Sequence, residues 1–216
     1  MLGFVAAMES EAEAVLSAFS EKTETLEWGR RVVRGKFRGE PVLLVVSGVG
    51  KANAAAATQL AIADGAKGIV NAGVCGGFDP SLKVGDVCEV SAAVQYDFDL
   101  AAVNGTDIGV LDERESARIP LRTTGRRPAF VIATGDHFND AEGDLPLLAR
   151  LGCGLRDMEC GAVAQVCERA GIPCLALKCV TNVIGSGATG QFRDNLAKCL
   201  ATLSDAVRHL PNGPIF

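Results

Sequence analysis

The 216-residue sequence has few of the residues on which many enzyme sites depend. It contains only two histidines, His137 and His209, together with one tryptophan and one tyrosine. With so few histidines, neither a histidine-rich metal centre nor a Ser-His-Asp triad is expected. Long apolar runs are missing as well. The longest, Val42–Val46, has the length of a strand and is far too short to span a bilayer.

Signals of export and of disulfide chemistry are also lacking. The N-terminus has no basic region and reaches Glu9 before an apolar signal segment can develop. The eight cysteines contain no C-x-x-C pair, and no histidines lie near them at zinc-binding spacing. We therefore expect reduced, buried thiols in a cytoplasmic protein that uses neither a metal nor another cofactor.

Charge and length narrow the class of protein further. The 26 acidic residues outnumber the 21 basic ones, and the net charge of −5 argues against a protein that neutralises nucleic-acid phosphates. A chain of this length, with 48% hydrophobic residues, can bury the core of one domain spanning residues 1–216. The 25 glycines are typical of many tight turns between strands and helices. These features predict a soluble α/β enzyme with a small-molecule substrate.

Apolar runs of strand length alternate with helical patterns along the chain. The alternation predicts βαβ units and a mostly parallel sheet covered on both faces. The polar stretch Asp99–Arg127 interrupts it and is interpreted as an excursion or flap. The expected strands are Leu2–Ala7, Arg31–Phe37, Pro41–Val46, Gly68–Asn71, Val84–Val94, Phe130–Thr134 and Pro173–Val180, and the expected helices are Glu9–Ser20, Ala52–Asp64, Cys160–Ala170 and Asn195–Leu210.

Candidate functional residues directly follow the expected strands, because ligands of open α/β sheets bind beyond the carboxyl ends of the strands. Glu9 and Glu11 begin a helix, where each either complements the helix dipole or faces this crevice. Glu159 begins another helix between small neighbours. Its acceptor-only carboxylate either caps that helix or accepts hydrogen bonds from two adjacent hydroxyls, such as those of a ribose. Gly48-Val-Gly50 matches neither a dinucleotide fingerprint nor a P-loop and is typical of a tight turn.

Seven motifs occur together and in a fixed order. They are Ala7-Met-Glu-x-Glu11, Ser47-Gly-Val-Gly-Lys-x-Asn-Ala-Ala, Asn71-Ala-Gly-x-x-Gly-Gly-Phe-Asp-Pro, Gly85-Asp-Val, Thr134-Gly-Asp-x-Phe138, Asp157-Met-Glu159 and Gly171-Ile-Pro. The set strongly resembles the purine nucleoside phosphorylase/uridine phosphorylase superfamily, and most closely its 5′-methylthioadenosine/S-adenosylhomocysteine nucleosidases. The resemblance runs from about Met1 to Asn182. It implies a three-layer α/β/α sandwich around a twisted mixed central sheet, assembled as a homodimer.

The resemblance also implies hydrolysis of the N-glycosidic bond of a purine nucleoside, with release of the free base and a ribose derivative. Glu11 would orient and deprotonate the attacking water, and Glu159 would bind the ribose hydroxyls. Carboxylates near the sugar suit this reaction, because its transition state resembles an oxocarbenium ion. The other residues implied to contact ribose or purine are Val49, Gly76, Phe138, Met158 and, through its backbone, Asn139.

One departure from the nucleosidase pattern concerns the leaving base. Those enzymes place an Asp after the last central strand to protonate N7 of adenine, whereas this chain has Asn182. An amide donates hydrogen bonds but has no proton to deliver near neutral pH. Asn at this position resembles superfamily members that act on 6-oxopurines, such as futalosine hydrolase. Alternatively, Asn182 caps a turn and another group supplies the acid, so adenine and 6-oxopurine nucleosides are both retained as candidate substrates.

A second departure is Val74, where the superfamily often has a serine that helps phosphorylases bind phosphate. The chain also lacks a glycine-arginine phosphate loop after its first strand, and the Glu11 carboxylate would repel an anion. These features favour water over phosphate as the nucleophile. The alternatives are a phosphorylase and a non-catalytic nucleoside-binding protein that lost the acid.

The two histidines have less specific interpretations. His137 is either a proton shuttle or a histidine at the rim of a loop. His209 is expected to interact with the dipole at the C-terminal end of the last helix.

Overall fold

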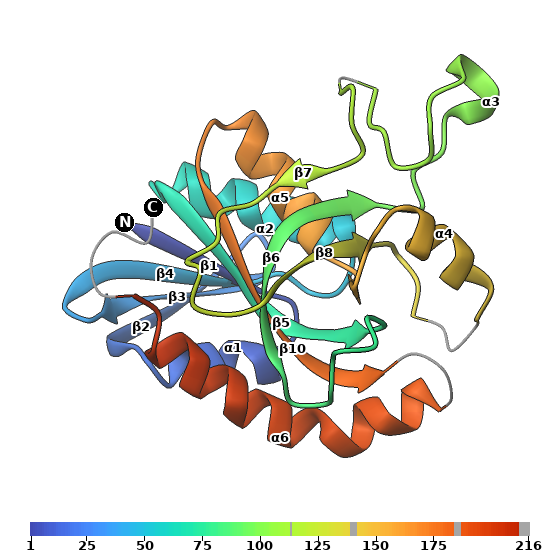
Figure 1. Cartoon of the computed structure of the whole chain (residues 1–216). Coiled ribbons are helices and arrows are strands. Elements are labelled where there is room, and N and C mark those ends of the chain that lie inside the picture. Colours follow the sequence, from blue (N-terminus) through green and yellow to red (C-terminus); the bar gives the residue numbers. More distant parts are fainter. Residues whose placement is uncertain (113, 139–141, 184–186, 212–216) are drawn as a thin grey trace.

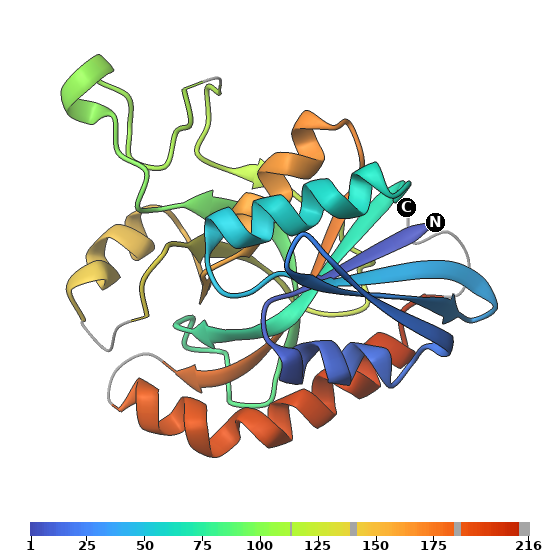
Figure 2. The same cartoon turned by 180° about the vertical axis from the view of Figure 1, so that it is seen from behind.

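A computed structural model describes residues 1–112, 114–138, 142–183 and 187–211. Figure 1 and Figure 2 show a twisted sheet between two helical layers, with α1 and α6 on one face and α2 and α5 on the other. This is the expected three-layer α/β/α arrangement. In chain order the elements are β1 (Leu2–Ala6), α1 (Glu9–Leu16), β2 (Ser20–Glu27), β3 (Arg30–Phe37), β4 (Glu40–Val46), α2 (Lys51–Ala63), β5 (Gly68–Gly77), β6 (Val87–Gln95), α3 (Ala101–Asn104), β7 (Ile119–Pro120), β8 (Ala129–Thr134), the 3-10 turn η1 (Glu142–Asp144), α4 (Leu145–Arg150), β9 (Leu155–Asp157), α5 (Cys160–Arg169), β10 (Cys174–Val183) and α6 (Ala188–Arg208).

The sheet is mixed, as the family resemblance implies, and the expectation of a mostly parallel sheet is wrong. Strands β4, β1, β5 and β10 pair in parallel, whereas β2, β3 and β4 form antiparallel hairpins. Two tight turns explain the hairpins. Trp28-Gly29 and Arg38-Gly39 all have positive φ, the backbone geometry that joins antiparallel neighbours through two residues.

Five strands close on themselves at one side of the sheet. Strand β5 pairs with β10, β10 with β6, β6 with β8, β8 with β9, and β9 returns to β5. The short strand β9 completes this cycle by pairing Arg156 with Gly76, which also faces Asn182 on β10. Segments that are distant in the sequence therefore meet at the end of β5.

The apolar strands supply two cores, one on each face of the sheet. Phe4 and Leu44 pack toward α1 and α6, whereas Val5 and Leu43 pack toward α2 and α5. Because successive side chains of a strand point to opposite faces, a strand covered on both sides must be apolar throughout. This requirement explains the continuous apolar run in Val42–Val46, all of which is buried.

Several element boundaries differ from those expected. Helix α1 ends at Leu16, and the exposed polar strand β2 begins at Ser20, inside the segment expected to be helical. Strand β5 continues to Gly77 through a segment expected to be a loop. Helix α6 begins at Ala188, two turns before the expected start. Within Asp99–Arg127, α3 projects away from the body of the molecule, and β7 pairs with β6.

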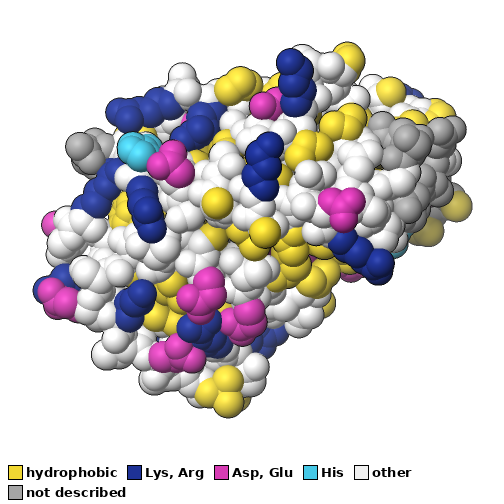
Figure 3. All heavy atoms as spheres, turned by 90° about the horizontal axis from the view of Figure 1, so that it is seen from below, with side chains coloured by type: hydrophobic (Ala, Val, Ile, Leu, Met, Phe, Trp, Pro, Cys, Tyr) yellow, Lys and Arg dark blue, Asp and Glu magenta, His cyan; other side chains and the backbone are white. Residues whose placement is uncertain are grey.

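The structure also bears on the cysteines and on the surface. All eight cysteines are buried and free. None of the helices among the described residues combines the length and the apolar character needed to cross a membrane. Figure 3 views the molecule from the side of α1 and α6, where acidic and basic side chains are interspersed with apolar ones.

Candidate active site

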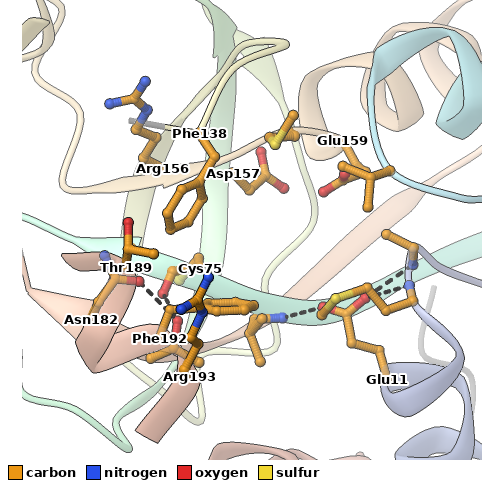
Figure 4. A pocket seen from close by; sticks show the side chains of 17 residues that line it. Glu11, Cys75, Phe138, Arg156, Asp157, Glu159, Asn182, Thr189, Phe192 and Arg193 are labelled. Carbon is orange, nitrogen blue, oxygen red and sulfur yellow. Dashed lines mark hydrogen bonds between the residues drawn. The ribbon is translucent and has the colours of Figure 1, made fainter. Parts of the chain in front are cut away.

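A cavity of about 360 Å³ opens where β1, β5, β9 and β10 end, and α6 forms one of its walls. Most of the residues singled out in the sequence meet here, although they come from separate parts of the chain (Figure 4). Asn139, the remaining candidate, lies outside the described residues. The candidates that line the cavity are Glu11, Val49, Gly76, Phe138, Met158, Glu159 and Asn182.

Glu11 is buried, and backbone N–H groups hold both of its carboxylate oxygens. The amides of Ala7 and Met8 donate to Oε2 at 3.1 and 3.0 Å, and the amide of Val74 donates to Oε1 at 2.7 Å. Gly73 makes this position possible, because a Cβ there would lie 2.6 Å from Oε1. Glu11 therefore points into the cavity instead of serving only the helix dipole. Glu9, by contrast, is exposed and pairs with Arg31 at 2.8 Å.

Glu159 reaches the start of α2 from the opposite side of the cavity. Its Oε1 accepts a hydrogen bond from the Gly50 amide at 2.9 Å, and its side chain is almost fully buried. The residue also stands immediately before α5 in its N-cap position, but its side chain makes no capping hydrogen bond there. One anchored oxygen leaves the rest of the carboxylate available to adjacent hydroxyls. The alternative that Glu159 merely caps its own helix is wrong.

Lys178 is the buried counter-charge to the acidic side of the cavity. Its Nζ lies 2.8 Å from Asp157 Oδ2, and both side chains are 2% exposed. Asp157 is held further by the Thr134 hydroxyl at 2.6 Å and the Cys160 amide at 3.0 Å. Burial alone would lower the pKa of Lys178, but Asp157 and the other anionic groups around it raise that pKa above its usual value. The lysine is therefore charged at neutral pH.

The two candidate glutamates have unusual acidities for the same electrostatic reasons. Burial raises the pKa of Glu11 above its ordinary value, although Lys178 and the three amide donors act in the opposite direction. Burial, reinforced by the neighbouring Asp157, raises the pKa of Glu159 to about 7. A raised pKa makes a carboxylate a better proton acceptor, as general-base catalysis requires.

Asn182 occupies the end of the cavity farthest from Glu159 in the view of Figure 4. The Thr181 hydroxyl lies 3.0 Å from Asn182 Oδ1, and that hydroxyl is also 3.1 Å from the Cys75 carbonyl oxygen. The Nδ2 group lies beside Gly76, where a Cβ would approach it to 3.2 Å. The Thr181 hydroxyl engages Oδ1, so Nδ2 is the donor atom that this cavity-lining amide can offer to a ligand.

Two aromatic rings extend the wall beside Asn182. Phe138 and Phe192 are in edge-to-face contact, with ring centroids 5.6 Å apart. Phe138 is 51% exposed and Val49 is 47% exposed, so both apolar side chains lie at the mouth of the cavity. Such a surface suits a flat aromatic ligand that enters between them.

The histidines lie outside the acidic side of the cavity. His137 contacts the Tyr96 hydroxyl and pairs with Asp144 at 3.1 Å, in a small recess that adjoins the main cavity and includes Arg156. His137 therefore lies at the rim of the cavity, as one of the two interpretations of the sequence predicts. His209 follows α6 directly, and its Nδ1 lies 2.9 Å from the Asp205 carbonyl oxygen, as expected for a helix C-terminus. Within the described part of the chain, no group of three His, Cys, Asp or Glu residues could hold a metal ion.

Sequence reasoning missed several residues of the site. The sequence did carry a signal for Lys178. It is the one charged residue in the apolar run expected to form a strand, and a charge buried there needs a partner of opposite charge. Gly73 was part of a motif, but only the contact with Glu11 shows why glycine is needed there. Nothing in the sequence pointed to Phe192 and Arg193, because the expected helix began after them.

Comparisons with known proteins agree with this geometry. Residues 1–210 match the family model of the phosphorylase superfamily. The chain is 32% identical to a 5′-methylthioadenosine/S-adenosylhomocysteine nucleosidase from Halalkalibacterium halodurans, in an alignment of 210 residues that covers 90% of each chain. The crystal structure of the corresponding nucleosidase from Helicobacter pylori has a TM-score of 0.88 at 24% identity, with 94% of each chain covered. Futalosine hydrolase of the same organism has a TM-score of 0.88 at 23% identity, with 96% of each chain covered, and these two structures establish likeness of fold.

Proposed function

The chain belongs to the phosphorylase superfamily, and on that basis we propose that it hydrolyses the N-glycosidic bond of a purine nucleoside. The proposed enzyme is of the 5′-methylthioadenosine/S-adenosylhomocysteine nucleosidase type and releases a free base and a ribose derivative. The observation that carries the proposal is the oriented Glu11 carboxylate, buried in the same cavity as Glu159 and Asn182. A protein that only bound nucleosides would not need a carboxylate placed to activate water.

The catalytic steps assign a separate task to each carboxylate. Glu159 accepts hydrogen bonds from the ribose hydroxyls, which places the anomeric carbon in front of Glu11. As the bond to the base breaks, positive charge develops on the sugar, and the surrounding carboxylates stabilise it. Water adds to the anomeric carbon and gives its proton to Glu11, while the electron pair of the broken bond leaves with the purine.

The leaving purine carries negative charge that the protein must stabilise. In the proposed complex the base lies against Phe138, and the Asn182 amide donates a hydrogen bond to N7 or to an oxygen at position 6. A 6-oxopurine spreads its charge over both atoms, so an uncharged donor suffices. Asn182 thereby supports a second candidate function, in which the substrate is a 6-oxopurine nucleoside.

The surroundings of Glu11 favour water over phosphate as the nucleophile. Its two oxygens already occupy the amide donors of Ala7, Met8 and Val74, the kind of N–H cluster that could otherwise bind an anion. A phosphate placed beside this carboxylate would also meet an unfavourable like charge. The Val74 side chain offers no hydroxyl in compensation.

The test is a substrate panel measured with and without phosphate. Methylthioadenosine, S-adenosylhomocysteine, inosine and futalosine are incubated with the protein, and base release is followed by chromatography. We expect release of base without phosphate. Strict dependence on phosphate would contradict hydrolysis and indicate a phosphorylase. Tight binding without base release over hours would indicate a non-catalytic binding protein.

Asn182→Asp is expected to change the base preference. A carboxyl group can carry a proton to N7 of adenine and accept a hydrogen bond from the 6-amino group, whereas it offers a 6-oxo group no second donor. The ratio of kcat/KM for 6-aminopurine over 6-oxopurine nucleosides should therefore rise about tenfold, the effect of one hydrogen bond to a charged group. An unchanged ratio would show that Asn182 does not read the base.

Homodimer assembly and a cytoplasmic location remain predictions. Sedimentation equilibrium and cell fractionation would check the two predictions.

A further inference from the structure

The ring of Phe138 depends on its own loop for a fixed position. Phe138 follows β8 and is 51% exposed, so packing in the core does not hold it. On the cavity side it contacts Phe192, with ring centroids 5.6 Å apart. Under the proposed function this ring stacks on the purine. The polar contacts of the residues beside Phe138 therefore decide how firmly the base is held.

Arg156 lies behind this loop and contacts it at two separate places. Its side chain is 10% exposed, and in the view of Figure 4 it points away from Glu11. Its Nη2 group lies 3.4 Å from the His137 carbonyl oxygen, just before Phe138, and 3.1 Å from Asp144 Oδ2, at the end of η1. One planar guanidinium thus joins residues on both sides of Phe138.

Tyr96 forms a platform between Arg156 and the loop. The Arg156 guanidinium carbon lies 5.1 Å from the centroid of the Tyr96 ring, and Nη2 donates to the Tyr96 hydroxyl at 2.5 Å. Burial raises the pKa of Tyr96 to about 12, so the hydroxyl keeps its proton and can donate it to the His137 ring, 3.3 Å away. The Tyr96 ring also packs on Gly135, where a Cβ would lie 2.5 Å from Cε1. The loop therefore rests on a ring that Arg156 holds in place.

The backbone of Arg156 belongs to the strands that carry the amide proposed to bind the base. Arg156 on β9 pairs with Gly76, and Gly76 pairs with Asn182 on β10. The contacts of Arg156 consequently fix the Phe138 ring relative to the Asn182 amide. A ring and an amide that bind the same purine must keep a constant separation, which two independently moving segments would not maintain.

We propose that Arg156 is a positioning residue for base binding. It holds the loop that carries Phe138 in the geometry that receives the purine, and it does not touch the reacting atoms. The proposal rests on the proposed function for the placement of the base against Phe138.

Arg156→Gln should weaken base binding and leave the chemical step nearly unchanged. Binding would then have to order the loop, at a cost of about tenfold in affinity for each residue that becomes fixed. The KM of the best nucleoside of the panel and the dissociation constant of its free base should both rise about tenfold, with kcat altered less than about threefold. Steady-state kinetics and calorimetry measure these values.

Arg156→Lys should restore part of the affinity, because an ammonium keeps the charge opposite Asp144 but lacks the planar fork. In both variants Asp136 can still accept the Lys51 amide, 2.7 Å away, so the loop retains a second anchor.

Asp144→Asn tests the same contact from the other side and serves if Arg156→Gln does not fold. It should weaken binding of the free base about threefold, within the range of a partly exposed ion pair. The double variant should bind the base no more weakly than Arg156→Gln alone, because the two changes remove one shared interaction.

Arg150→Gln is the matched control, since it removes an exposed positive charge from α4, the helix that follows the loop. It should keep the wild-type affinity. Unchanged base affinity in Arg156→Gln, or in Asp144→Asn where the first variant does not fold, would overturn the proposal. So would an equal loss in Arg150→Gln.

A reporter on the loop needs neither ligand nor turnover. The chain has one tryptophan, so Trp28→Phe combined with Phe138→Trp places a single indole in the loop. Its fluorescence anisotropy should decay faster when Arg156→Gln is added, because the released loop moves on the nanosecond timescale. An unchanged decay would contradict the proposal. Absence of base release from the wild type would contradict the proposed hydrolysis alone, since the anisotropy would still decide the role of Arg156.

Discussion

Glu11→Gln should lower kcat for base release about a thousandfold, within the range that general-base catalysis contributes. Glutamine has nearly the same shape but cannot take a proton from water. Base release from the best substrate of the panel, measured under saturation, checks this value. A variant that retained more than about a tenth of the wild-type kcat would contradict the assigned role of Glu11.

The control for this variant is Glu9→Gln, which removes an exposed carboxylate from the same helix. It should leave kcat unchanged. Glu11→Gln should also lose about 1–3 kcal/mol of stability, because its amide group must face one of the backbone N–H donors that the carboxylate accepts. Assays well below the unfolding temperature of the variant separate this effect from catalysis.

The pH profile gives an independent measure of the same carboxylates. Ionised Glu11 accepts the proton of water, and ionised Glu159 accepts both ribose hydroxyls. Because the pKa of Glu159 is raised to about 7, kcat/KM should increase as the pH rises through that value.

The same raised pKa of Glu159 should make the folded protein less stable as the pH rises. The unfolded chain releases this proton near the ordinary pKa, so the contribution of Glu159 to stability is present in acid and declines as the pH approaches neutrality.

Lys178→Met should destabilise the protein by about 3–5 kcal/mol, the cost of removing one partner from a buried ion pair. Asp157 would be left buried without its cation, and Glu11 and Glu159 would lose a charge that lowers their pKa values. Urea unfolding of the variant and the wild type at pH 8 measures the difference. The loss should be smaller in mild acid, where Glu159, whose pKa is raised to about 7, is more often neutral.

The double variant Lys178→Met with Asp157→Asn tests whether charge is the cause. If the lone Asp157 carboxylate accounts for the loss, neutralising it should restore part of the stability. A double variant no more stable than Lys178→Met would indicate that shape, rather than charge, makes Lys178 important. A loss below about 1 kcal/mol in Lys178→Met itself would contradict a strongly coupled buried pair.

Local patterns in the sequence were sufficient to predict the strands at the centre of the sheet. In Leu2–Ala7 and Pro41–Val46 nearly every residue is apolar, because both faces of these strands are covered, and the pattern is visible without knowledge of the fold. The polar edge strand β2 gave no such signal. Its residues are exposed on both faces, so its strand conformation depends on pairing with β3.

The extent of β5 illustrates a second limit of local reasoning. The glycines that follow Asn71 are typical of a loop, yet β10 and β9 hold this segment as a strand. These glycines meet side chains from other segments: Gly73 makes space for Glu11 and Gly76 for Asn182. Long-range packing thus overrides the local preference for a turn.

The scarcity of histidine and the motifs of the sequence by themselves determined the chemical groups of this protein. Glu11 and Glu159 supply carboxylates and Asn182 supplies an amide, and the sequence alone places these residues after expected strands. Only the tertiary structure decided how these groups behave. The amide that binds Glu11 Oε1 is 63 residues away in the chain, and the amide that binds Glu159 is 109 residues away. Burial, acidity and the addition of Arg193 to the cavity depend on distances between such segments, which local sequence patterns do not specify.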